Sequence, residues 1–186
     1  TTYVATHANT NSSTIRTMLD TWYQNNLTSY SSLIDGEAVF CGDRSLSSGT
    51  GIGTTSTKYG AYGRLDTNKT PQFKCPQTND LFTTAKSGSG NKKLTYPIGL
   101  ITADEANYAG LSRGGNIDHY LFTGASGFWT MTPYYTGNMF GAVSGATLQS
   151  AVLTSTYGIR PVINVSPYVK NITGIGTFAN PYVLNY

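Results

Sequence analysis

The stretch that decides the fold is FWTMTPYYTGNMFGAVSGATLQSAVLTSTYGIRPVINV, residues 128–165. Its apolar runs are separated by Gly, Ser and Thr, and Gly145 with Ala146 predicts a tight hairpin turn between two of them. Residues 159–165 are nearly continuous Ile, Pro and Val, which is typical of a strand buried on both faces. Pro161 lacks an amide N–H, so one ladder hydrogen bond is missing there. The stretch therefore predicts a small antiparallel sheet that forms the core.

The composition of the whole chain is poor in charge. Only 11% of the 186 residues are Asp, Glu, Lys or Arg, against roughly 25% in ordinary globular proteins. Tyr (14 residues), Gly (21 residues) and many Ser, Thr and Asn take their place. Such a surface favours a secreted or cell-surface protein. The length suits a single domain over residues 1–186, because no low-complexity linker divides the chain.

The charge pattern argues against a nucleic-acid partner, and the hydropathy pattern argues against a membrane span within the chain. The net charge of +3 is spread along the chain, and its one dense pair, Lys92 and Lys93, lies in a Gly- and Ser-rich loop. A nucleic-acid-binding protein is expected to concentrate Lys and Arg on one face. No run of 18 apolar residues predicts a membrane span, and no secretion signal opens the sequence. A targeting segment of an exported protein would then lie upstream.

The chain has two cysteines, Cys41 and Cys75, and neither belongs to a CxxC motif. The pattern favours a disulfide and leaves two alternatives, free buried thiols or a mixed metal site with His7 and His119. A disulfide would stabilise the fold by roughly 3–4 kcal/mol through the entropy of the unfolded chain. It would also place the protein outside a reducing cytosol. We predict no metal site and no cofactor.

The clearest predicted helix covers residues 14–27. Its apolar side chains recur at steps of three and four, and Ser12 or Ser13 precedes it as an N-cap. Trp22 lies on this apolar stripe, so we expect it in the core.

A second, short helix is predicted at residues 103–109. Thr102 and Glu105 have the spacing of a capping box, and Gly110 is a suitable stop. Asp104 and Glu105 are the only adjacent carboxylates of the chain, and their positions are already explained by the helix N-terminus.

The remaining segments read as irregular. Residues 42–74 show no helix or strand period, and they carry Tyr59 and Tyr62 among Gly, Ser and Thr. Residues 1–10 read as the end of a strand that enters a loop. We therefore expect a further segment to precede Thr1.

No catalytic motif is found. A hydrolase would use Asp104, Glu105 or Asp118 with His119, but a carboxylate pair needs a cleft, and no G-x-S-x-G elbow is present. Asp118 and His119 also point apart if their stretch is extended. We predict that the protein is not an enzyme.

Four pieces of the chain carry a resemblance: STIRTMLDTWYQNNL, the pair VFCGDRS and KCPQTND, LTYPIGLITADEANYAG, and WTMTP…YGIRPVINV…GIGTFANPYVL. They resemble an uncharacterised family of extracellular domains from Gram-positive, largely gut-associated bacteria, over about residues 7–186. Members of that family often follow a prepilin-like segment. The order of elements is also similar to the C-type-lectin-like fold, including its formylglycine-generating-enzyme-like branch, and implies an α+β fold with two helices, a small antiparallel sheet and long irregular loops. The chain departs from that fold's calcium-binding members, because it lacks the EPN or QPD and WND motifs.

Two functions follow from these observations. The first is a surface-displayed binding or adhesion module, whose partner is a host or environmental glycan or protein. Its Tyr-rich loops would supply contact area at low entropic cost. The candidate binding residues are Tyr59, Tyr62, His119, Tyr134 and Tyr135. The alternative, implied by the resemblance, is a structural subunit of an extracellular filament or type IV-like pilus.

Overall fold

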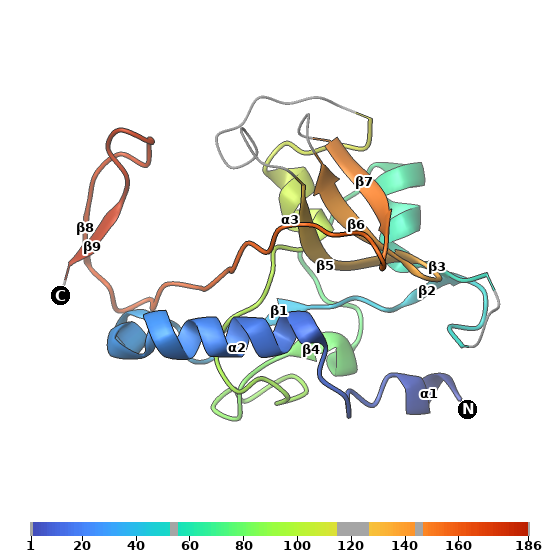
Figure 1. Ribbon diagram of the computed structural model, residues 1–186, viewed down its shortest axis with the longest axis horizontal. Helices are drawn as coiled ribbons and strands as arrows, with labels where there is room; N and C mark the ends of the chain where they lie inside the picture. Colours follow the sequence, from blue (N-terminus) through green and yellow to red (C-terminus); the bar gives the residue numbers. More distant parts are fainter. Residues whose placement is uncertain (1, 53–55, 115–126, 144–146, 186) are drawn as a thin grey trace.

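A five-stranded antiparallel sheet lies at the centre of the computed structural model, which describes residues 2–52, 56–114, 127–143 and 147–185 (Figure 1). The strand order is β2-β3-β5-β6-β7. The bounds are β2 (Leu46–Ser48), β3 (Lys58–Tyr59), β5 (Phe128–Tyr135), β6 (Asn138–Val143) and β7 (Thr147–Val152). The mixed helix and strand content, with small antiparallel sheets, confirms the predicted α+β class.

The hairpin of β6 and β7 is confirmed. The two strands pair from Asn138 with Val152 to Val143 with Thr147, and the predicted turn at Gly145 and Ala146 lies outside the described residues. The pairing of β5 with β6 shifts register on both sides of Pro133. Proline has no amide hydrogen to donate to the ladder, so an irregularity at this position is expected.

Both faces of the sheet are covered, so its longest strand is buried on both sides. Phe128 and Leu148 belong to one apolar cluster, together with buried residues of α3 (Ala103–Tyr108) and of a π-helix, η2 (Tyr62–Asn68). Trp129 and Ala151 belong to another, which includes Leu19 of α2 (Thr14–Asn26). Successive strand residues point to opposite faces. The three layers are therefore α2, the sheet, and η2 with α3.

The helix predicted at residues 14–27 is confirmed as α2, with Ser13 as its N-cap. Leu19 and Tyr23 are buried, but Trp22 is 42% exposed and Met18 is 54% exposed. The expectation of a core Trp22 is therefore wrong. Successive helical residues are about 100° apart around the axis. Met18 and Trp22 therefore lie to one side of the buried helix face that carries Leu19 and Tyr23.

The short helix with its capping box is also confirmed. The Thr102 hydroxyl accepts a hydrogen bond from the Glu105 amide, and the Glu105 carboxylate accepts one from the Thr102 amide. The helix, α3, ends within one residue of the predicted boundary. Gly110 follows with a φ of 107°, which glycine tolerates without strain.

Residues 159–165 do not form the predicted strand. They make single bridges instead, from Val162 to Gly99 and from Val165 to Ile34. Ile159 and Ile163 are half-buried against the α2 cluster, whereas Val165 is exposed. The prediction of burial on both faces is wrong, because this extended segment lies outside the central sheet and one of its sides is not covered by the described residues.

Two other segments differ from expectation. The first ten residues contain a short helix, α1 (Tyr3–Thr6), instead of a strand end. Residues 42–74 are not wholly irregular, since they supply β2, β3 and η2. These short elements depend on contacts with β5 and α3, which no local period reveals.

The smaller elements connect or flank these layers. They are η1 (Thr28–Leu33), β1 (Phe40–Cys41), η3 (Thr78–Asp80), β4 (Leu81–Phe82), β8 (Asn171–Thr173) and β9 (Val183–Asn185). β1 pairs with β4, and β8 pairs with β9, both antiparallel. No helix in the described part of the chain is long and apolar enough to span a bilayer.

Candidate functional site

Four of the five candidate binding residues lie together at one corner of the sheet. Tyr59 is in β3, Tyr62 begins η2, and Tyr134 and Tyr135 end β5. The pairing of Lys58 with Tyr135 joins β3 to β5. We call Lys58, Tyr59, Tyr62, Tyr134 and Tyr135 the tyrosine corner. The fifth candidate, His119, and its neighbour Asp118 lie outside the described residues.

Three of the four rings of the tyrosine corner, those of Tyr62, Tyr134 and Tyr135, form one connected group. The centroid of the Tyr134 ring lies 5.0 Å from that of Tyr62 and 5.0 Å from that of Tyr135. The Lys58 Nζ atom lies 4.3 Å from the Tyr62 ring centroid, within the range of a cation–π interaction. Among the described residues, no carboxylate forms an ion pair with Lys58. The surface of the corner therefore combines aromatic faces with an unneutralised positive charge.

Tyr134 supports the corner from inside. It is only 3% exposed and belongs to the core cluster under η2, so the expectation that it contacts a ligand directly is corrected. Its hydroxyl donates to Asp66 Oδ2 at 2.9 Å, and Arg113 Nε lies 2.5 Å from Asp66 Oδ1. The Arg113 guanidinium carbon also lies 5.0 Å from the Tyr134 ring centroid. Tyr59, Tyr62 and Tyr135 remain as the rings that a partner can reach, with Tyr135 37% exposed.

The buried hydroxyl of Tyr134 makes stability sensitive to alkaline pH. Burial, followed by the hydrogen bond to Asp66, raises the pKa of Tyr134 above its ordinary value. The unfolded chain therefore loses this proton first, and the free energy of unfolding falls as the pH rises above about 10. We expect Tyr134→Phe to flatten this fall, measured by urea unfolding at a series of alkaline pH values. The matched control Tyr168→Phe, at an 85% exposed position, should leave the slope unchanged. Equal slopes in all three proteins would contradict this assignment.

Asp104, one of the catalytic candidates, is held by Arg64. Arg64 Nε and Nη2 donate to the two carboxylate oxygens of Asp104 at 3.0 and 2.9 Å. The Gln72 amide donates to the same carboxylate at 2.9 Å. Arg64 Nη1 also lies 2.7 Å from Asp43 Oδ2, an ion pair without hydrogen-bond alignment. Burial lowers the pKa of Arg64, but Asp104 and Asp43 outweigh it, so that the pKa is raised. The Asp104 carboxylate has a structural partner on each oxygen.

Glu105, the other described catalytic candidate, borders a cavity of about 340 Å³. The cavity is also lined by Asp35, Glu37, Phe40 and Val162, and none of its described lining residues is a lysine or arginine. Its volume is at the low end for small-ligand pockets. The Glu105 carboxylate is engaged, because it accepts from the Thr102 amide and hydroxyl at 2.8 Å each. The cavity shares no residue with the tyrosine corner.

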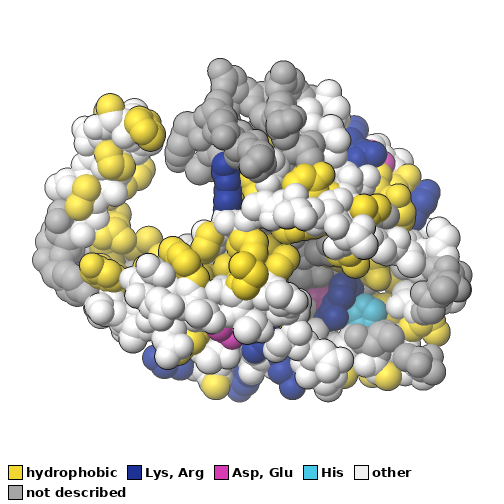
Figure 2. Space-filling model, in the orientation of Figure 1, with side chains coloured by type: hydrophobic (Ala, Val, Ile, Leu, Met, Phe, Trp, Pro, Cys, Tyr) yellow, Lys and Arg dark blue, Asp and Glu magenta, His cyan; other side chains and the backbone are white. Residues whose placement is uncertain are grey.

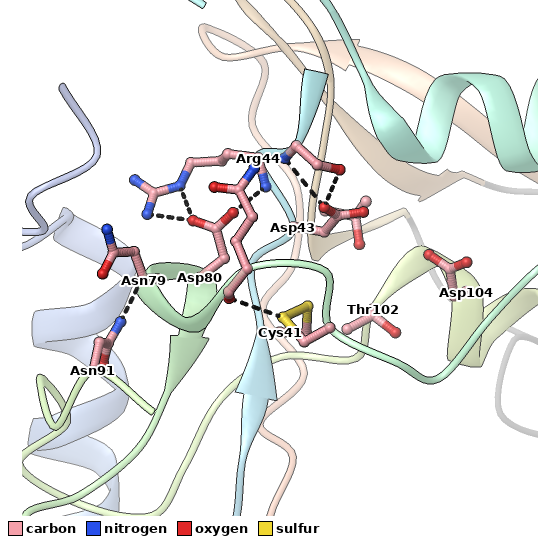
Figure 3. The surroundings of a disulfide bond; sticks show 12 residues. Cys41, Asp43, Arg44, Asn79, Asp80, Asn91, Thr102 and Asp104 are labelled. Atoms are coloured by element: carbon pink, nitrogen blue, oxygen red, sulfur yellow. Dashed lines mark hydrogen bonds and ion pairs between the residues drawn. A yellow bond between two sulfur atoms is a disulfide. The ribbon is translucent and has the colours of Figure 1, made fainter. Parts of the chain in front are cut away.

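The predicted disulfide is confirmed. Cys41 and Cys75 are joined with an S–S distance of 2.06 Å and a Cα–Cα distance of 5.6 Å. Beside it, Asp80 is fully buried and accepts from Arg44 Nε and from the Arg44 amide, both at 2.7 Å (Figure 3). The bridge is compatible with a protein outside the reducing cytosol. It closes the segment that carries β2, β3 and η2, and with them Tyr59 and Tyr62.

Sequence reasoning did not identify the charged members of this region. Lys58, Arg113 and Asp66 have no motif around them, and their roles come from contacts between β3, η2, β5 and the segment after α3. In the described residues, no three side chains of His, Cys, Asp and Glu gather to hold a metal ion. Comparison of the chain with protein-family models, with curated proteins and with solved structures found no match.

Proposed function

We propose that the protein is a non-enzymatic, extracellular binding module with a C-type-lectin-like fold, and that the tyrosine corner is its contact surface. The observation that carries the proposal is the row of contacting rings of Tyr62, Tyr134 and Tyr135, with Lys58, which forms no ion pair with a described carboxylate, over the Tyr62 ring. Aromatic side chains give large contact area with few rotatable bonds. The corner is built on β3, η2 and β5 and is supported by the buried Tyr134, so it is held in shape before a partner arrives.

The chemistry of the corner favours a partner that offers both flat faces and negative charge. Tyrosine rings can stack against a sugar face, and Lys58 can pair with a carboxylate or a sulfate group. Arg113 adds a second positive charge nearby, although Asp66 balances it. An acidic glycan combines these two features. We therefore propose a host or environmental glycan that carries uronic, sialic or sulfated sugars as the partner.

A glycan array that contains acidic glycans and their neutral counterparts tests this function. The native chain is expected to bind acidic members, with a signal that falls as salt screens the charge. Binding of neutral and acidic members alike would contradict the role of Lys58. Absence of binding on the glycan array and on an array of extracellular host proteins would contradict the binding function.

Substitution in the tyrosine corner should weaken this binding. We expect Tyr135→Ala and Lys58→Ala each to reduce the affinity for an acidic glycan by roughly tenfold, as is usual for an aromatic or charged contact residue at the centre of an interface. Biolayer interferometry with immobilised glycan measures the change. Tyr30→Ala is the matched control, because Tyr30 is exposed but lies in η1, outside the corner. Unchanged affinity in both corner variants would contradict the assignment.

The alternative function, a subunit of an extracellular filament, needs a surface by which copies of the chain contact one another. The exposed apolar side chains at the carboxyl end of the chain favour such a surface. This function is tested by electron microscopy of the concentrated protein. We expect filaments if the contact between copies is open-ended, and their absence at high concentration would count against it.

A further inference from the structure

The last part of the chain stands apart from the three layers. We call residues 168–185 the C-terminal arm; it is reached through the extended segment 159–167 and contains the paired strands β8 and β9 (Figure 1). Gly174, at a φ of 90°, shapes the arm, because a Cβ at this position would collide with the carbonyl oxygen of Pro181. A two-stranded hairpin is only marginally stable by itself in water. The arm is therefore expected to gain stability from packing against something else.

The arm exposes its apolar side chains instead of burying them. Six of them have exposed fractions between 49% and 98%: Tyr168, Ile172, Ile175, Phe178, Tyr182 and Val183. Figure 2 shows hydrophobic side chains along the arm and an open space between the arm and the rest of the molecule. Lys170 is the only charged side chain in the arm. The arm therefore exposes six large apolar side chains, which alternate with threonine and asparagine residues and one lysine.

The area of this surface is as large as a stable protein interface requires. An aromatic side chain contributes about 150–250 Å², so the three rings and three aliphatic side chains together expose roughly 800 Å². The largest apolar patch on a monomeric protein is usually about 300–600 Å². A standard interface covers roughly 800 Å² on each partner. Ile172 pairs with Leu184 and Val183 pairs with Thr173, so the exposed side chains lie on both faces of the hairpin, and a partner that covers the whole area must contact both faces.

The body of the molecule carries an exposed apolar surface of its own. Met18 and Trp22 are exposed on one flank of α2, and Val165 is exposed on the extended segment. Arg16 on the other flank donates a hydrogen bond to the Lys93 carbonyl. In Figure 1 the loop around Lys93 and the extended segment lie on opposite sides of α2. We call Met18, Trp22 and Val165 the α2 face.

We propose that the C-terminal arm of one chain packs against the α2 face of a second copy of the chain. The extended segment is fixed to its own body as far as Ser166, whose amide donates to the Leu33 carbonyl at 2.8 Å. Beyond this point the arm leads away from α2 and the central sheet (Figure 1). The contact explains why residues 159–165 and α2 both carry apolar side chains that their own chain leaves uncovered. It is independent of the tyrosine corner and of any glycan.

Sedimentation equilibrium of the full chain measures the association. We expect the native chain to form dimers or higher oligomers with rising concentration. Phe178→Asp places a charge in the contact and should weaken the association by roughly tenfold or more. Val4→Asp is the matched control, because Val4 is also exposed but lies in α1, at the opposite end of the molecule (Figure 1). A native chain that stays monomeric at high concentration would overturn the proposal, as would equal association of both variants.

A disulfide cross-link between two separately purified variants distinguishes a second copy from the arm's own body. Phe178→Cys and Trp22→Cys are mixed under mild oxidation, and the expected product is a covalent heterodimer joined through these two positions, identified by peptide mass spectrometry. Phe178→Cys mixed with Val4→Cys is the control and should give at least tenfold less heterodimer. The double variant Trp22→Cys with Phe178→Cys tests for a link within one chain. If this link forms, and the mixture of single variants gives no more heterodimer than the control, the arm packs against its own body and the proposal fails. Absence of any enriched link at these positions also overturns it.

Discussion

Arg64→Met is expected to lower the free energy of unfolding by about 3 kcal/mol or slightly more, because it leaves buried carboxylates without their positive partner. Asp104 and Asp43 are both nearly inaccessible to solvent, and Arg64 itself retains 15% side-chain exposure. Water can reach part of the guanidinium, which places the expected loss at the lower end of the range for a broken buried pair. Urea unfolding followed by tryptophan fluorescence at neutral pH measures the change.

Arg113→Met is the matched control for this substitution. It removes an arginine from an arginine–aspartate pair too, but both side chains of that pair, Arg113 and Asp66, are partly exposed at 30% and 22%. An ion pair of this kind contributes at most about 1 kcal/mol. Arg64, in η2, pairs with Asp43 after β1 and with Asp104 at the N-terminus of α3, whereas the contacts of Arg113 within the described part of the chain are with Asp66 and Tyr134. If the two variants lose the same stability, Arg64 is not the central buried contact described above.

Reduction of the Cys41–Cys75 disulfide is expected to cost about 4 kcal/mol of unfolding free energy, on the model in which the bridge restricts the unfolded chain. The closed segment contains η2, whose Leu65 is part of the core, and β3, which pairs with β5. The loss should therefore appear in the cooperative unfolding of the whole chain, and not only as local opening of one loop. Urea unfolding of the native chain with and without a reductant measures the difference.

The double variant Cys41→Ser with Cys75→Ser is the control for the reductant itself. Its unfolding midpoint should equal that of the reduced native chain and should not respond to the reductant. Limited proteolysis adds a local readout, since cleavage within residues 42–74 is expected to increase when the bridge is absent. An unchanged midpoint after verified reduction would contradict the stabilising role of the disulfide.

The elements that the sequence predicted correctly are those set by local rules. The period of α2 and its Ser13 cap, the capping box of Thr102 with Glu105, and the β6–β7 hairpin each depend on residues within a few positions of one another. The disulfide could be predicted because the two cysteines are the only ones present. Local pattern was sufficient in these cases because the tertiary structure agrees with it.

The errors arise where distant contacts decide the structure. Continuous apolar residues at 159–165 indicated a doubly buried strand, but β5 occupies that position, and its pattern is interrupted by Thr130, Thr132 and Pro133. The stripe of α2 is wider than the surface that covers it, so Trp22 remains exposed. The exposed Trp22 of α2 and the exposed Val165 of residues 159–165 both belong to the α2 face, which we propose as a contact between copies of the chain.

The candidate site was predicted in part, for the same reason. Tyrosine abundance identified Tyr59, Tyr62 and Tyr135 as candidates, but it could not separate them from the buried Tyr134. The positive charge of Lys58 over the Tyr62 ring depends on β3 lying beside η2, and nothing local to Lys58 indicates this arrangement. Contact residues of this kind become visible only when the fold brings their elements together.

Oxidative footprinting of tyrosine side chains tests the tyrosine corner most directly. The chain is oxidised briefly with and without the acidic glycan that gives the strongest array signal, and modification at each tyrosine is quantified by mass spectrometry. Our account predicts that the glycan protects Tyr62 and Tyr135, while Tyr30 and Tyr108, which are exposed outside the corner, are oxidised equally in both samples. Protection of Tyr30 or Tyr108 with no change at Tyr62 and Tyr135 would contradict it.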